Sequence, residues 1–444
     1  MNQVETALSE AEKLDVMVTG KFFAYIYETG DKGLKDTAFK ALVRFYDKNM
    51  LDFTAYKSAI FFEKEVVGFT RRLLHGDEGV VGTFTYGGTE SIMLAVLAAR
   101  NSFWKRRGRD VVPELIAPFT IHSAFLKAAH YLGLRVRLVD IDEKKKVNVE
   151  ALKEALNENT ALVAVSAPNW PYGTVDPVRD VAEITTDKGI YLHVDACVGG
   201  FILPFFEKLG LDVPLFDFRV EGVSSISADV HKYGYSPKGA SIVLFRNAEL
   251  KKESIFVDIF NPGYIFVNTA VLSSRSIGPL AAAYATINYL GEEGYLRLAK
   301  QVLGAREKIL TGLKRLGFKP LGPVESPILS LTNSEIDLVQ YTLEMRKSGW
   351  HFHLQRSIAK YNIPVNIHLA ISPIHSNTAD EFVRDSEAAV ETAKVRRTEV
   401  KLDEVLKDVM AGKVDSSVLP ILADMLDPEF AVSLVKQLVI DMYK

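Results

Sequence analysis

One lysine in this sequence has neighbours that would suit covalent chemistry. Lys232 lies in the polar stretch 227–239, which separates two apolar runs rich in β-branched residues, and it directly follows His231. A lysine in such a position can have a shifted pKa and react as an amine with a carbonyl group. A lone loop lysine is more often simply solvated, so this interpretation requires supporting residues elsewhere in the chain.

An aspartate lies earlier in the chain and is separated from Lys232 by one loop and one predicted strand. Asp195 follows the run 190–194, which is too uniformly apolar for a strand with one solvent-exposed face, so we expect a strand buried on both faces. A carboxylate at the carboxyl end of a buried strand lies where open α/β sheets bind ligands. The alternative is an aspartate that caps a helix, because Gly199 and Gly200 follow soon after.

A glycine turn precedes the first long apolar helix of this region. Gly87, Gly88 and Thr89 lead directly into the helical run 92–97. Free backbone N–H groups and the positive end of the helix dipole favour a phosphate at such a helix start. The turn is not a Walker loop, and it lacks the spacing of a dinucleotide site. A threonine-capped helix is the alternative that this pattern leaves open.

Taken together, the three groups match the requirements of pyridoxal 5'-phosphate. Its phosphate needs an anion site, its ring nitrogen needs an anionic partner, and its aldehyde needs an amine. The sequence therefore predicts pyridoxal 5'-phosphate as the cofactor and a small-molecule amine as the substrate.

The elements that must position these residues follow from hydrophobic periodicity. Between residues 88 and 246, helical patterns alternate with short apolar runs, which predicts an α/β domain with a buried, largely parallel sheet. We expect an N-terminal helical segment (1–75), a large α/β domain (76–290) and a smaller α+β domain (291–444). The strands expected in the large domain are 114–118, 134–139, 161–167, 190–194, 223–228 and 241–245. Asp176 and Pro177 predict the start of a helix.

Composition excludes several classes of function. The 53 Lys and Arg residues balance 56 Asp and Glu residues, so no basic field favours nucleic acid as a main partner. The single cysteine, Cys197, excludes a disulfide framework, and His351 with His353 offers no third metal ligand, so we predict no metal site. The first twenty residues lack a signal-peptide pattern, and no apolar run reaches the roughly 18 residues that a membrane span needs. We therefore expect a cytoplasmic protein.

Longer runs resemble the fold-type I pyridoxal-phosphate enzymes of the decarboxylase branch, and within it most closely the sphingosine-1-phosphate lyases. The runs that carry this resemblance are 87–91, 121–129, 166–168, 173–177, 193–201, 216–220 and 225–235. The resemblance extends over nearly the whole chain. It implies a transferase-like α/β fold with a mainly parallel central sheet and flanking helices, and a homodimer with shared active sites.

The resemblance also implies a role for each matching residue. Lys232 would bind the cofactor as a Schiff base, Asp195 would pair with the pyridinium nitrogen, and His122 would stack on the ring. The residues implied to hold the cofactor phosphate are Gly87, Gly88, Thr89 and His231, with Ser274 or Arg275 from the neighbouring subunit. Lys238 would contact a substrate phosphate, with Tyr27 as its companion.

Two reactions are consistent with these residues. The first is cleavage of a carbon–carbon bond in a sphingoid base phosphate, giving a fatty aldehyde and phosphoethanolamine. The alternative is decarboxylation of an amino acid by an enzyme of the same branch. A non-catalytic carrier is disfavoured, because binding alone does not require Lys232.

One departure from the lyase pattern supports the decarboxylase alternative. The lyases have a phosphate-binding histidine in an Asn-Pro-Leu-His-Pro stretch, where residues 49–53 here read Asn-Met-Leu-Asp-Phe. Asp52 would repel a substrate phosphate. Lys57 or Lys21 could supply the missing positive charge. Tyr86 and Phe266 also depart from the pattern, which has a serine and a tyrosine there.

Overall fold

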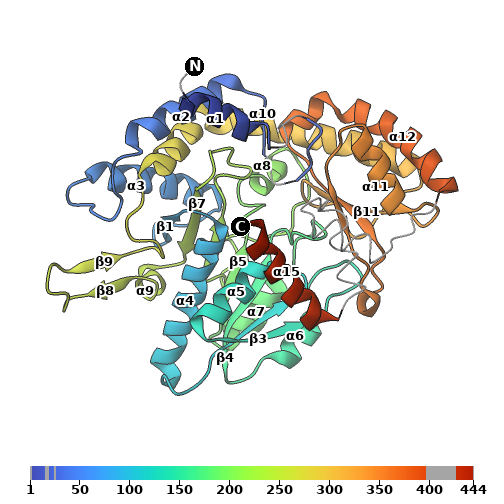
Figure 1. The fold of residues 1–444 in the computed structure, drawn as a ribbon. Coiled ribbons are helices and arrows are strands. Elements are labelled where there is room, and N and C mark those ends of the chain that lie inside the picture. Colours follow the sequence, from blue (N-terminus) through green and yellow to red (C-terminus); the bar gives the residue numbers. More distant parts are fainter. Residues whose placement is uncertain (1–2, 16–19, 25–26, 397–426, 444) are drawn as a thin grey trace.

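A mixed seven-stranded sheet forms the centre of the computed structural model, which describes residues 3–15, 20–24, 27–396 and 427–443 (Figure 1). Its strands lie in the order β1-β7-β6-β5-β4-β2-β3. Neighbours from β6 to β3 pair in parallel, whereas β7 is antiparallel to both β6 and β1. The strands are β1 (Val81–Thr85), β2 (Glu114–Pro118), β3 (Arg135–Val139), β4 (Thr160–Ser166), β5 (Tyr191–Asp195), β6 (Ser225–Ala228) and β7 (Ser241–Phe245).

The predicted strands of the central sheet are confirmed, and one strand of this sheet, β1, was not predicted. β4, β5, β6 and β7 are buried along their whole length, which explains their uniformly apolar sequences. β1 reads Val-Gly-Thr-Phe-Thr and lacks a continuous apolar run. It forms at the sheet edge because it pairs with β7, so its conformation depends on a partner about 160 residues away.

Helices cover both faces of this sheet. α4 (Gly88–Arg107) and α5 (Ser123–Leu132) pack on one face, where Leu115, Leu162 and Val243 point. The neighbouring residues on the same strands point to the other face. That face is covered by α3 (Lys57–Leu73), α6 (Val149–Ala155), α7 (Val178–Asp187), α8 (Leu203–Lys208) and part of α10 (Gly278–Arg315).

The ends of the chain build the periphery of the molecule. α1 (Gln3–Glu12) and α2 (Lys32–Phe45) precede α3, and α2 packs along α10. Asp31 caps α2 by accepting a hydrogen bond from the Leu34 N–H at 3.0 Å. α9 (Ala248–Lys252) follows β7, and α15 (Pro428–Met442) lies near the C-terminus.

A second, antiparallel sheet has the order β10-β11-β13-β12. Its strands are β10 (Lys319–Pro320), β11 (Ile328–Thr332), β12 (His353–Gln355) and β13 (Asn366–Ala370), accompanied by α11 (Leu338–Lys347), α12 (Ala379–Val395) and the 3-10 turns η1 (Ala359–Tyr361) and η2 (Pro373–Asn377). α10 joins this sheet to the large one and is interrupted at Gly291, whose φ of 53° favours glycine. The boundary predicted at residue 291 falls on this interruption, and the division into domains stays a prediction.

A two-stranded hairpin, β8 (Phe256–Asp258) with β9 (Phe266–Asn268), projects from the large domain (Figure 1). Large apolar side chains near its tip are exposed, including Phe260 at 88% and Ile265 at 65%. Within the described residues, no helix is both long enough and apolar enough to cross a bilayer.

Candidate active site

A cavity of about 590 Å³ lies at the carboxyl ends of β5 and β6, beside the start of α4. Carboxyl ends of neighbouring parallel strands meet at one edge, and ligands bind there in open α/β sheets. The residues predicted from the sequence that line this cavity are Tyr27, Gly87, Gly88, Thr89, His122, Asp195, His231 and Lys232. The fold thus brings together side chains that are up to 205 positions apart.

The glycine turn begins α4 without a capping side chain. Gly87 is the N-cap residue, and no side chain accepts a hydrogen bond there, which excludes the threonine-capped alternative. The first N–H groups of a helix have no partner within the helix, so this end can bind an anion. A Cβ atom on Gly88 would lie 2.8 Å from Cys197 Sγ and 2.9 Å from both carboxylate oxygens of Asp229. Only glycine fits at this position.

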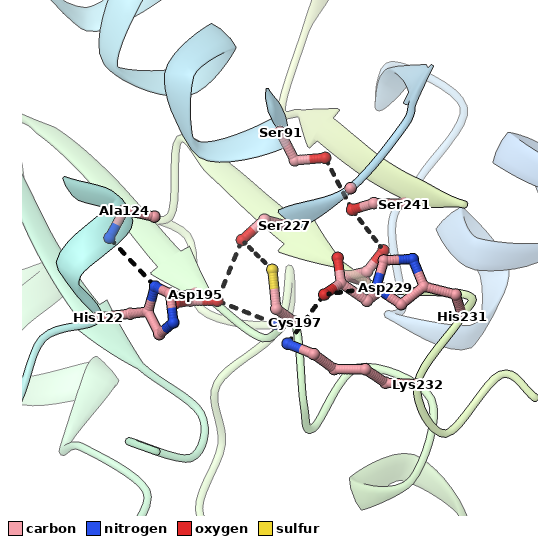
Figure 2. A network of polar contacts seen from close by, with 12 residues as sticks. Ser91, His122, Ala124, Asp195, Cys197, Ser227, Asp229, His231, Lys232 and Ser241 are labelled. Carbon is pink, nitrogen blue, oxygen red and sulfur yellow. Dashed lines mark hydrogen bonds and ion pairs between the residues drawn. The ribbon is translucent and has the colours of Figure 1, made fainter. Parts of the chain in front are cut away.

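Asp195 ends β5, and a buried network holds its carboxylate (Figure 2). Its Oδ1 accepts hydrogen bonds from the Cys197 N–H at 3.0 Å and from Ser227 Oγ at 3.3 Å. Ser227 Oγ lies 3.2 Å from His193 Nε2, and Ser225 Oγ lies 2.7 Å from His193 Nδ1. Burial lowers the pKa of His193 to about 4, so this ring is neutral at pH 7. Asp195 does not cap a helix, and it faces the cavity.

Lys232 forms an ion pair that was not predicted from the sequence. Its Nζ lies 2.9 Å from Asp229 Oδ2, as Figure 2 shows. Asp229 is 2% exposed and lines the cavity. Burial raises the pKa of Asp229, but the charges and hydrogen bonds around it, with Lys232 the largest of these, together bring the net pKa below the ordinary value. The only feature of the sequence that could have indicated this ion pair is the position of Asp229, three residues before Lys232.

Two histidines beside the cavity have fixed ring orientations. His231 Nδ1 accepts a hydrogen bond from the Ala240 N–H at 3.2 Å, so its proton is on Nε2, 3.6 Å from Asp229 Oδ2. Burial lowers the pKa of His231. His122 is the N-cap residue of α5, where its Nδ1 accepts a hydrogen bond from the Ala124 N–H at 3.1 Å. Its exposed ring stays at the cavity edge.

Tyr27 and Lys238 lie together at one side of the cavity. Lys238 Nζ is 5.0 Å from the centre of the Tyr27 ring, and this ring packs edge-on against Tyr233 at 4.9 Å. Lys238 itself is not among the described side chains that line the cavity. Loss of hydration, followed by the nearby Lys232 ammonium, lowers the pKa of Lys238 to about 8.

Ser274 and Arg275 lie outside the cavity of their own chain. Ser274 is exposed, and Arg275 Nη1 donates hydrogen bonds to the carbonyls of Leu272 at 2.9 Å and Ser273 at 3.2 Å. The Tyr86 hydroxyl donates a hydrogen bond to the carbonyl of Ser276, the residue that follows Arg275. Tyr86 thus ties the glycine turn to this segment, which accounts for its departure from the lyase pattern.

Asp52 serves a local turn. Its Oδ1 accepts hydrogen bonds from the Thr54 hydroxyl at 2.6 Å and from the N–H groups of Thr54 and Ala55, and the Thr54 hydroxyl contributes most to the lowered pKa of Asp52. Asp52 is exposed and does not line the cavity that the structure describes. Lys21, considered as a compensating cation, instead forms an ion pair with Glu381 at 2.7 Å.

The residues present fit pyridoxal 5'-phosphate. The start of α4 could hold its phosphate, and Gly88 leaves the backbone open to close approach. Asp195 presents a buried carboxylate to the cavity that could pair with the ring nitrogen, and Lys232 Nζ could bond to the aldehyde. The side chains required for binding therefore all face one space.

Comparison with known proteins agrees with this site. The pyridoxal-dependent decarboxylase conserved domain matches residues 23–302. The chain is 35% identical to sphingosine-1-phosphate lyase of Arabidopsis thaliana over 401 residues, which cover 88% of this chain and 72% of the relative. It is 33% identical to a probable L-tyrosine/L-aspartate decarboxylase of Methanothermobacter thermautotrophicus over 307 residues, which cover 69% of this chain and 82% of the relative.

A solved structure shows the same similarity in three dimensions. Sphingosine-1-phosphate lyase from Burkholderia pseudomallei superposes with a TM-score of 0.83 at 33% identity, covering 91% of this chain and 93% of that chain. The predicted fold class and the predicted cofactor are confirmed. The chain belongs to the pyridoxal-dependent decarboxylase family and is a lyase that uses pyridoxal 5'-phosphate.

Proposed function

We propose that this enzyme cleaves a carbon–carbon bond in a phosphorylated amino alcohol of the sphingoid base phosphate class, releasing a fatty aldehyde and phosphoethanolamine. The observation that carries the proposal is a second cation beside the cofactor lysine. Lys238 Nζ lies over the Tyr27 ring, and Tyr27 lines the cavity. An amino-acid decarboxylase has no substrate phosphate and would not need this charge.

Each side chain of the site then has one task. When bound, pyridoxal 5'-phosphate withdraws electrons from the substrate carbon next to the amine, so that a bond at this carbon can break. Asp195 keeps the ring nitrogen protonated, and Lys232 holds the aldehyde. The start of α4 and His231 bind the cofactor phosphate. His122 covers the ring face at the cavity edge.

The substrate would be held at both of its ends. Tyr27 and Lys238 bind the phosphate, which as a dianion is stabilised by a nearby ammonium. The apolar side chains of Met93, Val271 and Leu272 line other parts of the cavity and can contact an alkyl chain. Asp52 is solvated and already accepts three hydrogen bonds, so its repulsion of the phosphate is screened.

A homodimer with shared active sites is part of this proposal. Val271 and Leu272 line the cavity, yet they are 48% and 50% exposed, and the apolar hairpin β8–β9 lies just before them. A second copy that covers this surface would bury apolar area and would bring its own Ser274 or Arg275 near the cofactor phosphate. Sedimentation at micromolar concentration tests this assembly, and a monomer would refute the shared site.

A cytoplasmic location also belongs to this proposal. It is supported by the single cysteine, Cys197, which is buried as a free thiol and compatible with a reducing compartment. Fractionation of the cells that produce the protein tests this location.

Amino-acid decarboxylation is the second candidate. It is favoured by the absence of the lyase histidine in the stretch 49–53 and by the similarity to the Methanothermobacter decarboxylase. The test is product analysis of the cofactor-loaded enzyme with sphingosine 1-phosphate, L-tyrosine or L-aspartate, with Lys232→Ala as the control. Phosphoethanolamine and a long-chain aldehyde from the unmodified enzyme alone support the lyase. Carbon dioxide from an amino acid, without phosphoethanolamine, supports the decarboxylase.

A further inference from the structure

The proposed function gives the buried carboxylate of Asp229 no task. Asp229 is 2% exposed, and its Oδ2 lies 2.9 Å from Lys232 Nζ (Figure 2). A buried carboxylate is costly unless a cation or hydrogen-bond donors compensate it. We propose that Asp229 is a positioning residue that keeps the nitrogen of Lys232 as an ammonium whenever this nitrogen is not bonded to the cofactor.

The local backbone makes this pair a built-in feature of the turn after β6. Asp229 and Lys232 are three residues apart, and the Lys232 N–H donates a hydrogen bond to the Asp229 carbonyl at 3.2 Å. The Asp229 N–H in turn donates to the Cys197 carbonyl at 3.3 Å. On its other side the carboxylate faces Gly88, where a Cβ atom would lie 2.9 Å from both oxygens. The carboxylate has little room to turn away from Lys232.

The other groups around Lys232 cannot replace Asp229. Burial raises the pKa of the Cys197 thiol well above its ordinary value, so Cys197 is neutral. Tyr27 is a phenol, and the Asp195 carboxylate is already bonded to Cys197 and Ser227. These are the groups near Lys232 that could otherwise carry a negative charge.

One positive group nearby opposes an ammonium at Lys232, because Lys238 carries a like charge. His231 lies on the same turn, but it accepts a hydrogen bond at Nδ1 and burial lowers its pKa, so it adds no positive charge at pH 7. Burial is the largest single influence on the pKa of Lys232 and lowers it, but Asp229 is the largest of the groups that raise it, and the net pKa lies above the ordinary lysine value. Asp229 is therefore the main group that favours an ammonium at Lys232.

The pair has a consequence when an amine substrate replaces Lys232 on the cofactor. An incoming substrate ammonium would have to give up protons to bond to the cofactor, and the displaced Nζ would take up the same number and leave as an ammonium, so protons and charge would balance in the exchange. An ammonium has no free electron pair and cannot attack the cofactor again. By stabilising this form, Asp229 favours the exchange toward bound substrate and disfavours the return of Lys232.

This inference rests on the assignment of Lys232 as the cofactor lysine in the proposed function, but the ion pair can be tested in the apoprotein by itself. Acetic anhydride reacts with neutral amines, and peptide mass spectrometry measures acetylation at each lysine as the pH is raised. In the unmodified apoprotein we expect Lys238 to reach half-maximal labelling near pH 8, and Lys232 only at a higher pH. Labelling of Lys232 at a lower pH than Lys238 would overturn the proposal, and this comparison requires no variant.

A pair of variants isolates the carboxylate. Asp229→Asn removes the charge and keeps the shape, and we expect acetylation of Lys232 at pH 8 to rise about tenfold or more, which corresponds to at least one pKa unit. Asp217→Asn is the matched control, because Asp217 is also buried and ion-paired, with Arg219 at 2.9 Å. The control should leave Lys232 labelling unchanged. An identical labelling profile in Asp229→Asn and the unmodified protein would contradict the proposal.

The two proposals can fail separately. Labelling of the apoprotein does not depend on the reaction, so a decarboxylase would refute the proposed lyase function and leave the ion pair intact. In the loaded enzyme, Asp229→Asn should shift the exchange of bound cofactor back toward Lys232, observed as a smaller change in cofactor absorbance at the same concentration of substrate amine. Unchanged exchange in that variant would oppose the inference, even if the enzyme remains a lyase.

Discussion

The carboxylate of Glu90 accepts a hydrogen bond from the backbone N–H of Val271 at 2.7 Å, although the two residues are 181 positions apart. The same oxygen accepts from Leu272 N–H at 3.1 Å, and the other oxygen accepts from Tyr86 N–H at 2.7 Å. One buried carboxylate thus joins the glycine turn to the opposite wall of the cavity. Its three N–H donors explain how an acid is tolerated beside a phosphate site.

Replacing Glu90 by glutamine should loosen this connection. The amide NH₂ group of Glu90→Gln would face backbone donors, so at least one hydrogen bond would be lost at a cost of about 1–3 kcal/mol. We expect faster hydrogen exchange in residues 270–273 and weaker cofactor binding by the apoprotein. Exchange at the β2 strand is the internal reference, and an unchanged rate in 270–273 would refute this role of Glu90.

Adding one methyl group to the glycine turn should block the cofactor phosphate. In Gly88→Ala the Cβ atom would meet Cys197 and Asp229 at less than 3 Å, so the start of α4 must shift. We expect the dissociation constant for pyridoxal 5'-phosphate to rise at least roughly tenfold, a change of about 1.4 kcal/mol. Gly304→Ala, in α10, is the control because its Cβ atom would have no neighbour within 4 Å. Equal effects of both substitutions would argue against a specific role of the turn.

The pH dependence of substrate binding should report on Lys238. Its pKa of about 8 lies below the ordinary value, so the ammonium is present below pH 8 and is lost as the pH rises through 8. We expect the KM for a phosphorylated substrate to rise above pH 8 by roughly ten- to a hundredfold. This factor corresponds to the loss of about 1.5–3 kcal/mol, which is the contribution of a hydrogen bond to a charged group.

Two variants separate this effect from titration of the substrate. Lys238→Arg keeps its charge at high pH and should show a flatter KM profile, whereas Lys238→Gln should have a high KM at every pH. The substrate amine titrates equally in all three enzymes. A profile that is identical in the unmodified enzyme and Lys238→Arg would exclude Lys238 as the titrating group.

The hydrogen bond between Ser227 and Asp195 should act on the ring nitrogen of the cofactor. Ser227→Ala removes one donor to Asp195 Oδ1 and leaves the Cys197 N–H in place. We expect affinity for pyridoxal 5'-phosphate to fall about fivefold, close to 1 kcal/mol. An analogue with carbon in place of the ring nitrogen should bind equally to both proteins. Equal losses for the two ligands would indicate a packing defect instead.

Much of the fold could be predicted from the sequence. The strands at 114–118 and 241–245 form with the predicted bounds, because a strand buried on both faces requires a continuous apolar run. Asp195 and Lys232 meet at one cavity because the carboxyl ends of neighbouring strands share an edge of the sheet. Chain order and hydrophobic pattern are enough for these inferences.

The local sequence pattern gave wrong predictions where residues distant in the chain determine the contacts of a side chain. The helix predicted after Asp176 and Pro177 forms as α7, but the expectation that Asp176 caps it was wrong. Asp176 accepts hydrogen bonds from the N–H groups of Val147 and Ser166 at 2.8 Å, and Pro177 is the N-cap residue of α7. Burial raises the pKa of Asp176 to about 6. The same short pattern fits a helix cap and a buried contact, and only packing distinguishes them.

The sequence by itself therefore determined most of the sheet, the cofactor and eight of the residues that line the cavity, since these follow from local residue type, strand order and the family resemblance. The tertiary structure decided which partners distant in the chain the buried carboxylates have: Glu90 with Val271, and Asp176 with Val147. A buried carboxylate must find a cation or donors wherever the fold brings them within about 3 Å. These partners depend on how segments approach in space, and sequence spacing does not specify that approach.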